Sequence, residues 1–147
     1  MVAAAVRVTW DGSAFDSLMH SESGEVARFL SQVGLRVAVT ARRLAPVSHD
    51  GSHGRPAGYM RSQIRHVVSK DSEGLHCDII SPALTPEGYP YPLGVEVGTK
   101  PHTITSHGDY PLRTKQGRVL GHSVQHPGTA PHPYLRPALE ELGNIVG

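Results

Sequence analysis

Histidine is the residue type with the most conspicuous potential chemistry in this sequence, with 10 copies among 147 residues. His49 and His53 are separated by three residues, as are His122 and His126, and five residues separate His126 from His132. Histidines with this spacing can share a zinc ion on a helix or form half of a zinc finger. These pairs lie in segments rich in Gly and Pro, and no cysteine pair or His-Glu-x-x-His motif completes a site. We therefore expect surface or interface histidines and no bound metal, with a His-rich metal-binding domain as the alternative.

Nucleophilic and acid–base catalysis find equally little support in the sequence. It contains no Gly-x-Ser-x-Gly motif, no phosphate-binding loop and no dinucleotide fingerprint. The single cysteine, Cys77, lies in an alternating run that predicts a strand, where its neighbour His76 would point to the opposite face. We expect Cys77 to be a small buried hydrophobe rather than a reactive thiol. The prediction is that the protein is not an enzyme and needs no cofactor.

Length and composition predict a single domain spanning residues 1–147 with an aliphatic core, because 38% of residues are hydrophobic and only 5% are aromatic. The net charge of +1 gives no domain-wide basic face for DNA. Arg113, Lys115 and Arg118 form a local basic cluster that is more typical of a solvated loop. The segment MVAAAVRVTW lacks the basic start of a signal peptide, and we expect no membrane span and synthesis in a reducing cytoplasm.

The clearest periodic signal predicts a helix from Glu25 to Leu44. Its apolar stripe consists of Val26, Leu30, Val33, Val37, Ala41 and Leu44, widened by Phe29 and Ala38. We expect Ser23 to cap the start of the helix and Pro46 to end it. Gly34, in the middle, is unfavourable in a helix and predicts the close approach of another backbone.

The remaining segments predict an α+β fold, in which a small antiparallel sheet is packed by the long amphipathic helix and by a C-terminal helix. In the first half of the chain we expect a strand at Val6–Trp10, a helical turn at Ala14–Met19, a mobile loop at 47–58, and strands at Tyr59–Ser69 and Leu75–Ser81 joined by a turn at Lys70–Gly74. An irregular connection at Pro82–Pro92 and a short apolar piece at Leu93–Val97 follow, and then strands at His102–Ser106 and Arg118–Val124 joined by the long loop 107–117. The last expected element is a helix that starts near Leu135 or Arg136 and ends or frays at Gly143. Its apolar side is expected to carry Tyr134, Leu135, Ala138, Leu139 and Leu142.

Four segments, in order, carry a family resemblance. They are Ala45-Pro46 after the long helix, Gly58-Tyr59-Met60-Arg61-Ser62-Gln63-Ile64, the stretch from Tyr89 to Thr99 that closes in Glu96-Val97-Gly98-Thr99, and the stretch from Pro127 to Leu139. Together they resemble the gene-product-ten-like tail components of lambdoid siphophages, which are tail-completion or head–tail joining proteins. The residues singled out as structural or interface candidates are Pro46, Tyr59, Arg61, Tyr91, Glu96, Gly98, Thr99, Pro127, Gly128, Pro133, Tyr134, Leu135 and Pro137.

The resemblance implies a structural subunit of the bacteriophage neck or tail, a minor tail protein that completes the tail and joins it to the head connector. It further implies a homo-oligomeric ring of six copies, contacts with neighbouring neck and tail proteins, passage of DNA through the ring, and no membrane. The protein would reside in the virion, and in the host cytoplasm during virion assembly. A different neck ring protein, such as a tail terminator, stopper or adaptor, is the alternative within this setting.

Physical reasoning gives several of these motif residues a role without the family. Gly98 is expected to adopt a positive φ angle, which favours glycine. Pro127 and Gly128 would set the approach to the last helix, and Tyr134 and Leu135 would fill the core or contact a neighbouring subunit. Pro133 and Pro137 cannot both lie in the first turn of that helix.

Overall fold

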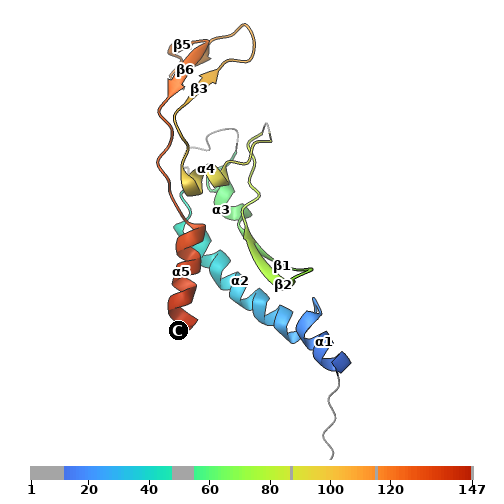
Figure 1. Cartoon of the computed structure of the whole chain (residues 1–147). Helices are drawn as coiled ribbons and strands as arrows, with labels where there is room; N and C mark the ends of the chain where they lie inside the picture. The colour runs from blue at the N-terminus through green and yellow to red at the C-terminus, as the bar shows by residue number, and fades with distance from the viewer. Residues whose placement is uncertain (1–11, 48–54, 87, 115, 147) are drawn as a thin grey trace, which may run out of the picture.

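The structure is a computed structural model that describes residues 12–47, 55–86, 88–114 and 116–146 (Figure 1). The elements follow in the order α1 (Gly12–His20), α2 (Glu25–Leu44), α3 (Tyr59–Gln63), β1 (Arg65–Asp71), β2 (Gly74–Ile80), α4 (Pro92–Val97), β3 (His102–Thr105), β4 (Leu112–Arg113), β5 (Val119–Gly121), β6 (Ser123–His126) and α5 (Leu135–Val146). This mixture of helices with small antiparallel sheets confirms the predicted α+β class. The predicted strand at Val6–Trp10 and most of the predicted loop at 47–58 lie outside the described residues.

The long helix α2 has the bounds that the periodicity predicts. Its buried residues are Ala27, Gly34, Val37, Ala38 and Ala41. Phe29 was expected to widen this stripe, but its side chain is 63% exposed. Phe29 and Ala38 are nine residues apart, which is about two and a half turns of an α-helix, so they point to opposite sides. The predicted place of Phe29 was therefore wrong.

The start of α2 also differs from the prediction. The residue before the helix is Gly24 in an extended conformation, and no side chain caps the first turn. Ser23 instead places its hydroxyl 3.2 Å from that of Ser21. A Cβ at position 24 would lie 3.2 Å from the carbonyl oxygens of Ser17 and Leu18, so the tight connection from α1 leaves little room for a capping side chain there. The predicted end is confirmed, because Ala45 closes the last turn and Pro46 follows.

The hairpin of β1 and β2 packs on α2, and Gly34 is the point of closest approach. A Cβ at position 34 would overlap the Sγ atom of Cys77 and lie 3.0 Å from Cβ of His66. The close approach expected at Gly34 is thus present, although it is made by side chains of the hairpin rather than by backbone.

The segment Tyr59–Ser69 was predicted as one strand, but its first residues form the short helix α3. Met60 and Ile64 are both buried, at the spacing of four residues that places two side chains on one face of a helical turn. The β-branched residues that favour a strand occur only from Ile64 onward. The strand therefore begins at Arg65.

An extension that we call the arm comprises residues 102–126 and projects away from the helical body (Figure 1). β3 pairs with β6, and the much shorter β4 pairs with β5. The sequence predicted a single strand at Arg118–Val124 and a long loop at 107–117. Both predictions were wrong, because Gly121 has a φ angle of 93° that divides the strand into β5 and β6, and Leu112 and Arg113 of the loop pair with β5.

The C-terminal helix α5 begins at Leu135, as predicted, and packs on α2. It continues past Gly143, where an end was expected, since one glycine costs a helix only about 1 kcal/mol. Leu139 was expected on the buried side but is 53% exposed. Ala138, expected on the same side, does lie in the core, and a step of one residue turns the Leu139 side chain by about 100° around the helix axis.

The main core lies where the second half of α2 meets α3 and α5. Its buried members are Val37, Ala38, Ala41, Ala45, Met60, Ile64, Ala83, Tyr134 and Ala138. Tyr134 and Ile64 are the largest side chains that are fully buried. No helix among the described residues is both long enough and apolar enough to cross a membrane.

Candidate functional site

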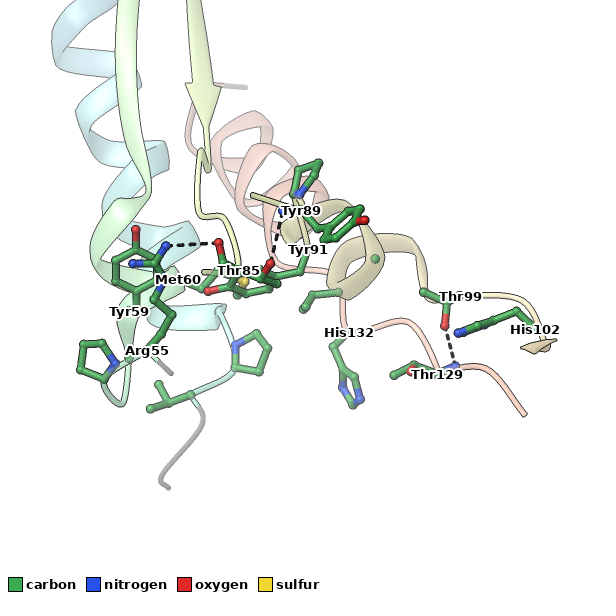
Figure 2. A pocket seen from close by; sticks show the side chains of 17 residues that line it. Arg55, Tyr59, Met60, Thr85, Tyr89, Tyr91, Thr99, His102, Thr129 and His132 are labelled. Carbon is green, nitrogen blue, oxygen red and sulfur yellow. Dashed lines mark hydrogen bonds between the residues drawn. The ribbon is translucent and has the colours of Figure 1, made fainter. Parts of the chain in front are cut away.

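An open groove of about 840 Å³ lies where the end of α2, helices α3 and α4, and the base of the arm meet (Figure 2). Its lining is mostly apolar and aromatic. The residues that line it are Pro46, Val47, Arg55, Pro56, Gly58, Tyr59, Met60, Thr85, Tyr89, Pro90, Tyr91, Gly94, Val95, Thr99, His102, Thr129 and His132. Four of the residues singled out from the sequence, Pro46, Tyr59, Tyr91 and Thr99, are among them.

Arg55 brings a positive charge to one end of the groove. Its guanidinium lies over the ring of Tyr59, 4.7 Å from the ring centroid (Figure 2). Its Nε donates to the carbonyl oxygen of Leu84 at 3.1 Å and its Nη2 to that of Thr85 at 3.2 Å. The described lining residues include no carboxylate.

The other end of the groove is the base of the arm, where Thr99 and Thr129 join the two chain segments (Figure 2). Each donates its backbone N–H to the carbonyl oxygen of the other, at 3.0 and 3.1 Å. The N–H of Thr129 also lies 3.0 Å from Oγ1 of Thr99. Close by, the N–H of His132 donates to the carbonyl oxygen of Val95 at 2.8 Å. These bonds connect α4 to the segment that leads from the arm to α5.

Two glycines make this junction possible. Gly98 has a φ angle of 75°, as expected, and a Cβ there would lie 2.6 Å from the carbonyl oxygen of Thr129. Gly128 has a φ angle of 87°, and a Cβ there would overlap the carbonyl oxygen of Thr99 and lie 2.9 Å from the carbonyl carbon of Lys100. Each glycine therefore allows the backbone of the other segment to approach.

Glu96 connects α4 to the start of α5. Its Oε2 accepts hydrogen bonds from the backbone N–H groups of Tyr134 at 2.8 Å and Leu135 at 2.9 Å, and its Oε1 accepts one from Arg136 at 3.0 Å. Burial acts to raise the pKa of Glu96, but the three N–H donors and the charge of Arg136 outweigh it, so this pKa lies below its ordinary value. Glu96 thus satisfies the free N–H groups at the start of a helix almost 40 residues away.

Arg61 and Arg42 make a reciprocal pair of contacts between α2 and the α3–β1 junction. Nη2 of Arg61 donates to the carbonyl oxygen of Ala45 at 2.7 Å, just after α2. Nε and Nη2 of Arg42 donate to the carbonyl oxygen of Ile64 at 2.9 and 2.6 Å. Arg61 is therefore a structural residue that satisfies a carbonyl at the end of α2.

Tyr134 fills the core below the groove, with no exposed surface. Burial raises the pKa of its hydroxyl, whereas the neighbouring Ser81 hydroxyl acts to lower it. Neither hydroxyl has a hydrogen bond of ordinary geometry among the described residues. Leu135 packs on the same core, and Pro137 lies in the first turn of α5, where a missing N–H has no intrahelical partner. Pro133 precedes the helix and is exposed.

The structure therefore divides the predicted site residues into three groups. Arg61, Glu96, Gly98, Gly128, Tyr134, Leu135 and Pro137 hold the frame, and Pro46, Tyr59, Tyr91 and Thr99 face the groove. Pro127 and Pro133 are exposed on the connection from the arm to α5. The sequence analysis did not single out the groove residues Arg55, Tyr89 and His132, because their segments have no periodicity that predicts where a side chain points.

The histidines are dispersed rather than gathered. His102 and His126 are cross-strand partners with ring centroids 5.0 Å apart, and Nδ1 of His126 accepts from the N–H of Gly128 at 3.1 Å. His122 bonds to Ser106 at 3.0 Å. Within the described parts of the chain, no group of three or more His, Cys, Asp or Glu residues is arranged to hold a metal ion. His49 and His53 lie outside these parts.

Cys77 is partly buried on the hairpin face that packs on α2. Burial and the charge of Asp78 raise the pKa of its thiol, against a hydrogen bond from the backbone of Val67 that acts to lower it. A raised pKa keeps the thiol protonated at neutral pH, and the thiolate is the reactive form. This environment agrees with the small hydrophobe that the sequence predicts.

No protein-family model, curated protein or solved structure gives a significant match to this chain. Two of the four motifs, the stretches Tyr89–Thr99 and Pro127–Leu139, meet in one region of the molecule, where α4, the arm base and the start of α5 come together.

Proposed function

We propose that this chain is a structural subunit of a tailed-phage neck that completes the tail and joins it to the head connector as a ring of six copies. The observation that supports this proposal best is the meeting of the motif residues at the base of the arm. Glu96, Gly98 and Thr99 from one motif contact Gly128, Thr129 and Tyr134 from the other. These contacts fix the direction of a projecting arm, which is a geometric task suited to assembly.

The arm itself supports a role in assembly because it has little core of its own. All four residues of β3 are exposed, and a two-stranded ribbon is marginally stable in water. Apolar side chains on the arm are also uncovered, with Ile104 38%, Leu120 41% and Val119 53% exposed. Neighbouring subunits that cover these side chains would stabilise the arm.

A second uncovered surface lies on the outer side of α2. Phe29 is 63% exposed, Val39 54% and Leu35 49%. A closed ring uses two different patches on each copy, one for each neighbour. The arm and the outer side of α2 are at different places on the molecule and can serve different contacts (Figure 1).

Passage of DNA through the ring requires only weak, sequence-independent contacts. Arg113 and Arg118 flank the β4–β5 turn in the outer part of the arm. Exposed arginines there would attract the phosphate backbone if the arms point into the channel.

The proposal is tested by deleting the gene from the phage that encodes it and imaging the particles by electron microscopy. We expect filled heads and tails of normal length that remain unjoined, with infectivity restored by the wild-type gene in trans. Tails of irregular length would indicate the tail-terminator alternative instead. Joined, infectious particles without the protein would contradict a neck role altogether.

A further inference from the structure

We propose that the groove binds the loop between β3 and β4 in the arm of a neighbouring copy, with Asp109, Tyr110 and Pro111 as the inserted segment. This inference rests on the proposed ring and names the contact that would close it. We call this loop, residues 107–111 in the outer part of the arm, the arm tip, although the β4–β5 pair follows it in the chain. The occupant of the groove is thus a second copy of this chain.

The arm tip carries an unsupported aromatic side chain. Tyr110 is 86% exposed, more than the other exposed large hydrophobic residues of the described chain. A tyrosine side chain buries about 150–250 Å² when it enters an interface. Pro111 follows it and restricts the backbone, which lowers the entropy lost on binding.

The groove matches this segment in size and in chemistry. Its volume of about 840 Å³ lies within the range of roughly 300–1,000 Å³ that is typical of ligand-binding pockets. Tyr59, Tyr91 and Val95 offer apolar and aromatic surface to a tyrosine ring. Three prolines that line the groove, Pro46, Pro56 and Pro90, add apolar surface and have no backbone N–H group that would need a hydrogen-bond partner.

Charge complementarity fixes the orientation. Arg55 is the arginine of the groove, and its Nη1 has no partner among the described residues. Asp109 immediately precedes Tyr110 and is exposed, so its carboxylate can reach the guanidinium when the ring enters the groove. The described groove residues contribute no competing carboxylate.

The tip of a given chain cannot fill the groove of the same chain. His102, the first residue of β3, lines the groove, and β3 runs away from it for 4 residues, about 13 Å at the usual rise of a strand. The tip lies beyond Ser106, whose N–H bonds to His122 across the arm. The Thr99–Thr129 bridge holds the base of the arm, and Figure 1 shows the far end of the arm directed away from the body. The contact is therefore made between copies, and repetition of one tip in the next groove closes a ring.

A charge exchange between two chains tests the contact. D109R chains lose the carboxylate of the tip, and R55D chains lose the guanidinium of the groove, so we expect each variant alone to remain monomeric where the wild type forms rings. In an equimolar mixture, each D109R tip meets an R55D groove, and each R55D chain keeps a native tip for a native groove. Rings of alternating chains should then form, and they close only with an even number of copies. Sedimentation velocity on the full chains, at protein concentrations up to about 1 mM, the upper end of weak association, measures the species.

A second variant changes the tip and leaves the groove unchanged, so a folding defect caused by R55D cannot explain its effect. Tyr110→Ser changes an exposed residue of the tip, and we expect it to weaken self-association by about tenfold or more, as loss of a central aromatic side chain commonly does. Leu139→Ser, at a 53% exposed position on α5, is the matched control and should assemble as the wild type does.

Three outcomes would overturn the contact. These are wild-type rings that Y110S and D109R leave unchanged, a mixture of D109R and R55D chains that does not restore rings, and a wild-type chain that stays monomeric throughout. Each of them leaves the neck role to be decided by the particle images, so failure of this inference and failure of the proposed function remain distinguishable.

Discussion

The carboxylate of Glu96 and the backbone N–H of Tyr134 are 2.8 Å apart, although 38 positions separate these residues in the chain. The same carboxylate accepts the N–H groups of the next two residues. A side chain at the end of α4 therefore serves as the N-terminal cap of α5, because Tyr134, the residue before the helix, has its own side chain buried in the core. The arm emerges between these two positions, so the cap also fixes where the arm leaves and rejoins the body.

Replacing this cap should weaken the fold in a pH-dependent way. For Glu96→Gln we expect a loss of about 0.5–2 kcal/mol in the free energy of unfolding at pH 7, the range for lost N-caps. Because the pKa of Glu96 is lowered in the folded state, its stabilisation is fully present above the ordinary glutamate pKa and is lost as pH falls through the folded-state pKa. The difference between wild type and variant should therefore shrink toward pH 3, the acid side of ordinary glutamate titration.

Urea unfolding followed by circular dichroism, at pH values on both sides of that titration, measures this difference. Glu140→Gln is the matched control, since Glu140 lies exposed on α5, the helix that Glu96 caps. It should show little difference from the wild type at either pH. A constant deficit for Glu96→Gln at all pH values would contradict the proposed role of the ionised carboxylate.

The two glycines at the arm base should tolerate no side chain. For Gly98→Ala and Gly128→Ala we expect a loss of about 3 kcal/mol or more in stability, because strain at positive φ adds to the overlap with backbone atoms. Gly117→Ala separates the two effects, since Gly117 has a φ angle of 82° but open space at its Cβ position. It should cost only about 1–2 kcal/mol, the strain alone. Equal losses at Gly98 and Gly117, in thermal or urea unfolding, would show that the overlap is relieved without cost.

Sequence patterns predicted the elements whose period is strong and missed the features that depend on contacts between distant segments. The bounds of α2 follow from 20 residues of apolar periodicity ended by Pro46. Gly98 was foreseen from its residue type. By contrast, Glu96 is one acidic residue of a short segment, and no residue near it in the sequence indicates that its partners are the N–H groups at the start of α5. The groove could not be predicted either, because Arg55 and His132 line it from irregular segments that have no periodic pattern.

The buried hydroxyl of Tyr134 should contribute little to stability, whereas its ring should contribute a great deal. Since the hydroxyl has no hydrogen bond of ordinary geometry among the described residues, we expect Tyr134→Phe to leave stability within about 1 kcal/mol of the wild type or to raise it. Tyr134→Leu should cost about 1–3 kcal/mol and Tyr134→Ala about 3–5 kcal/mol, because the cavity grows with each truncation. Denaturant unfolding of the three variants gives the series. A large loss for Tyr134→Phe would indicate a strong bond to Ser81.

Helix propensity alone would predict a gain from Gly34→Ala of about 1 kcal/mol. We expect a loss of about 1–3 kcal/mol instead, the usual cost of overpacking, because the added methyl group would overlap Sγ of Cys77 and crowd Cβ of His66. Combining Gly34→Ala with Cys77→Ala should recover part of that loss, since the sulfur is then gone. A double-mutant cycle by urea unfolding measures the coupling, and purely additive effects would contradict the contact.

The cap that Glu96 provides also has a consequence for the order in which the chain folds. Its bond to Tyr134 closes a loop of 38 residues, and closing a flexible loop of that length costs about 3 kcal/mol of entropy. We expect pairing of β3 with β6 to bring the two ends of the loop together first, since His102 lies opposite His126. If it forms first, the arm shortens the loop that the cap must close, so we expect this outward-facing ribbon to speed the docking of the last helix.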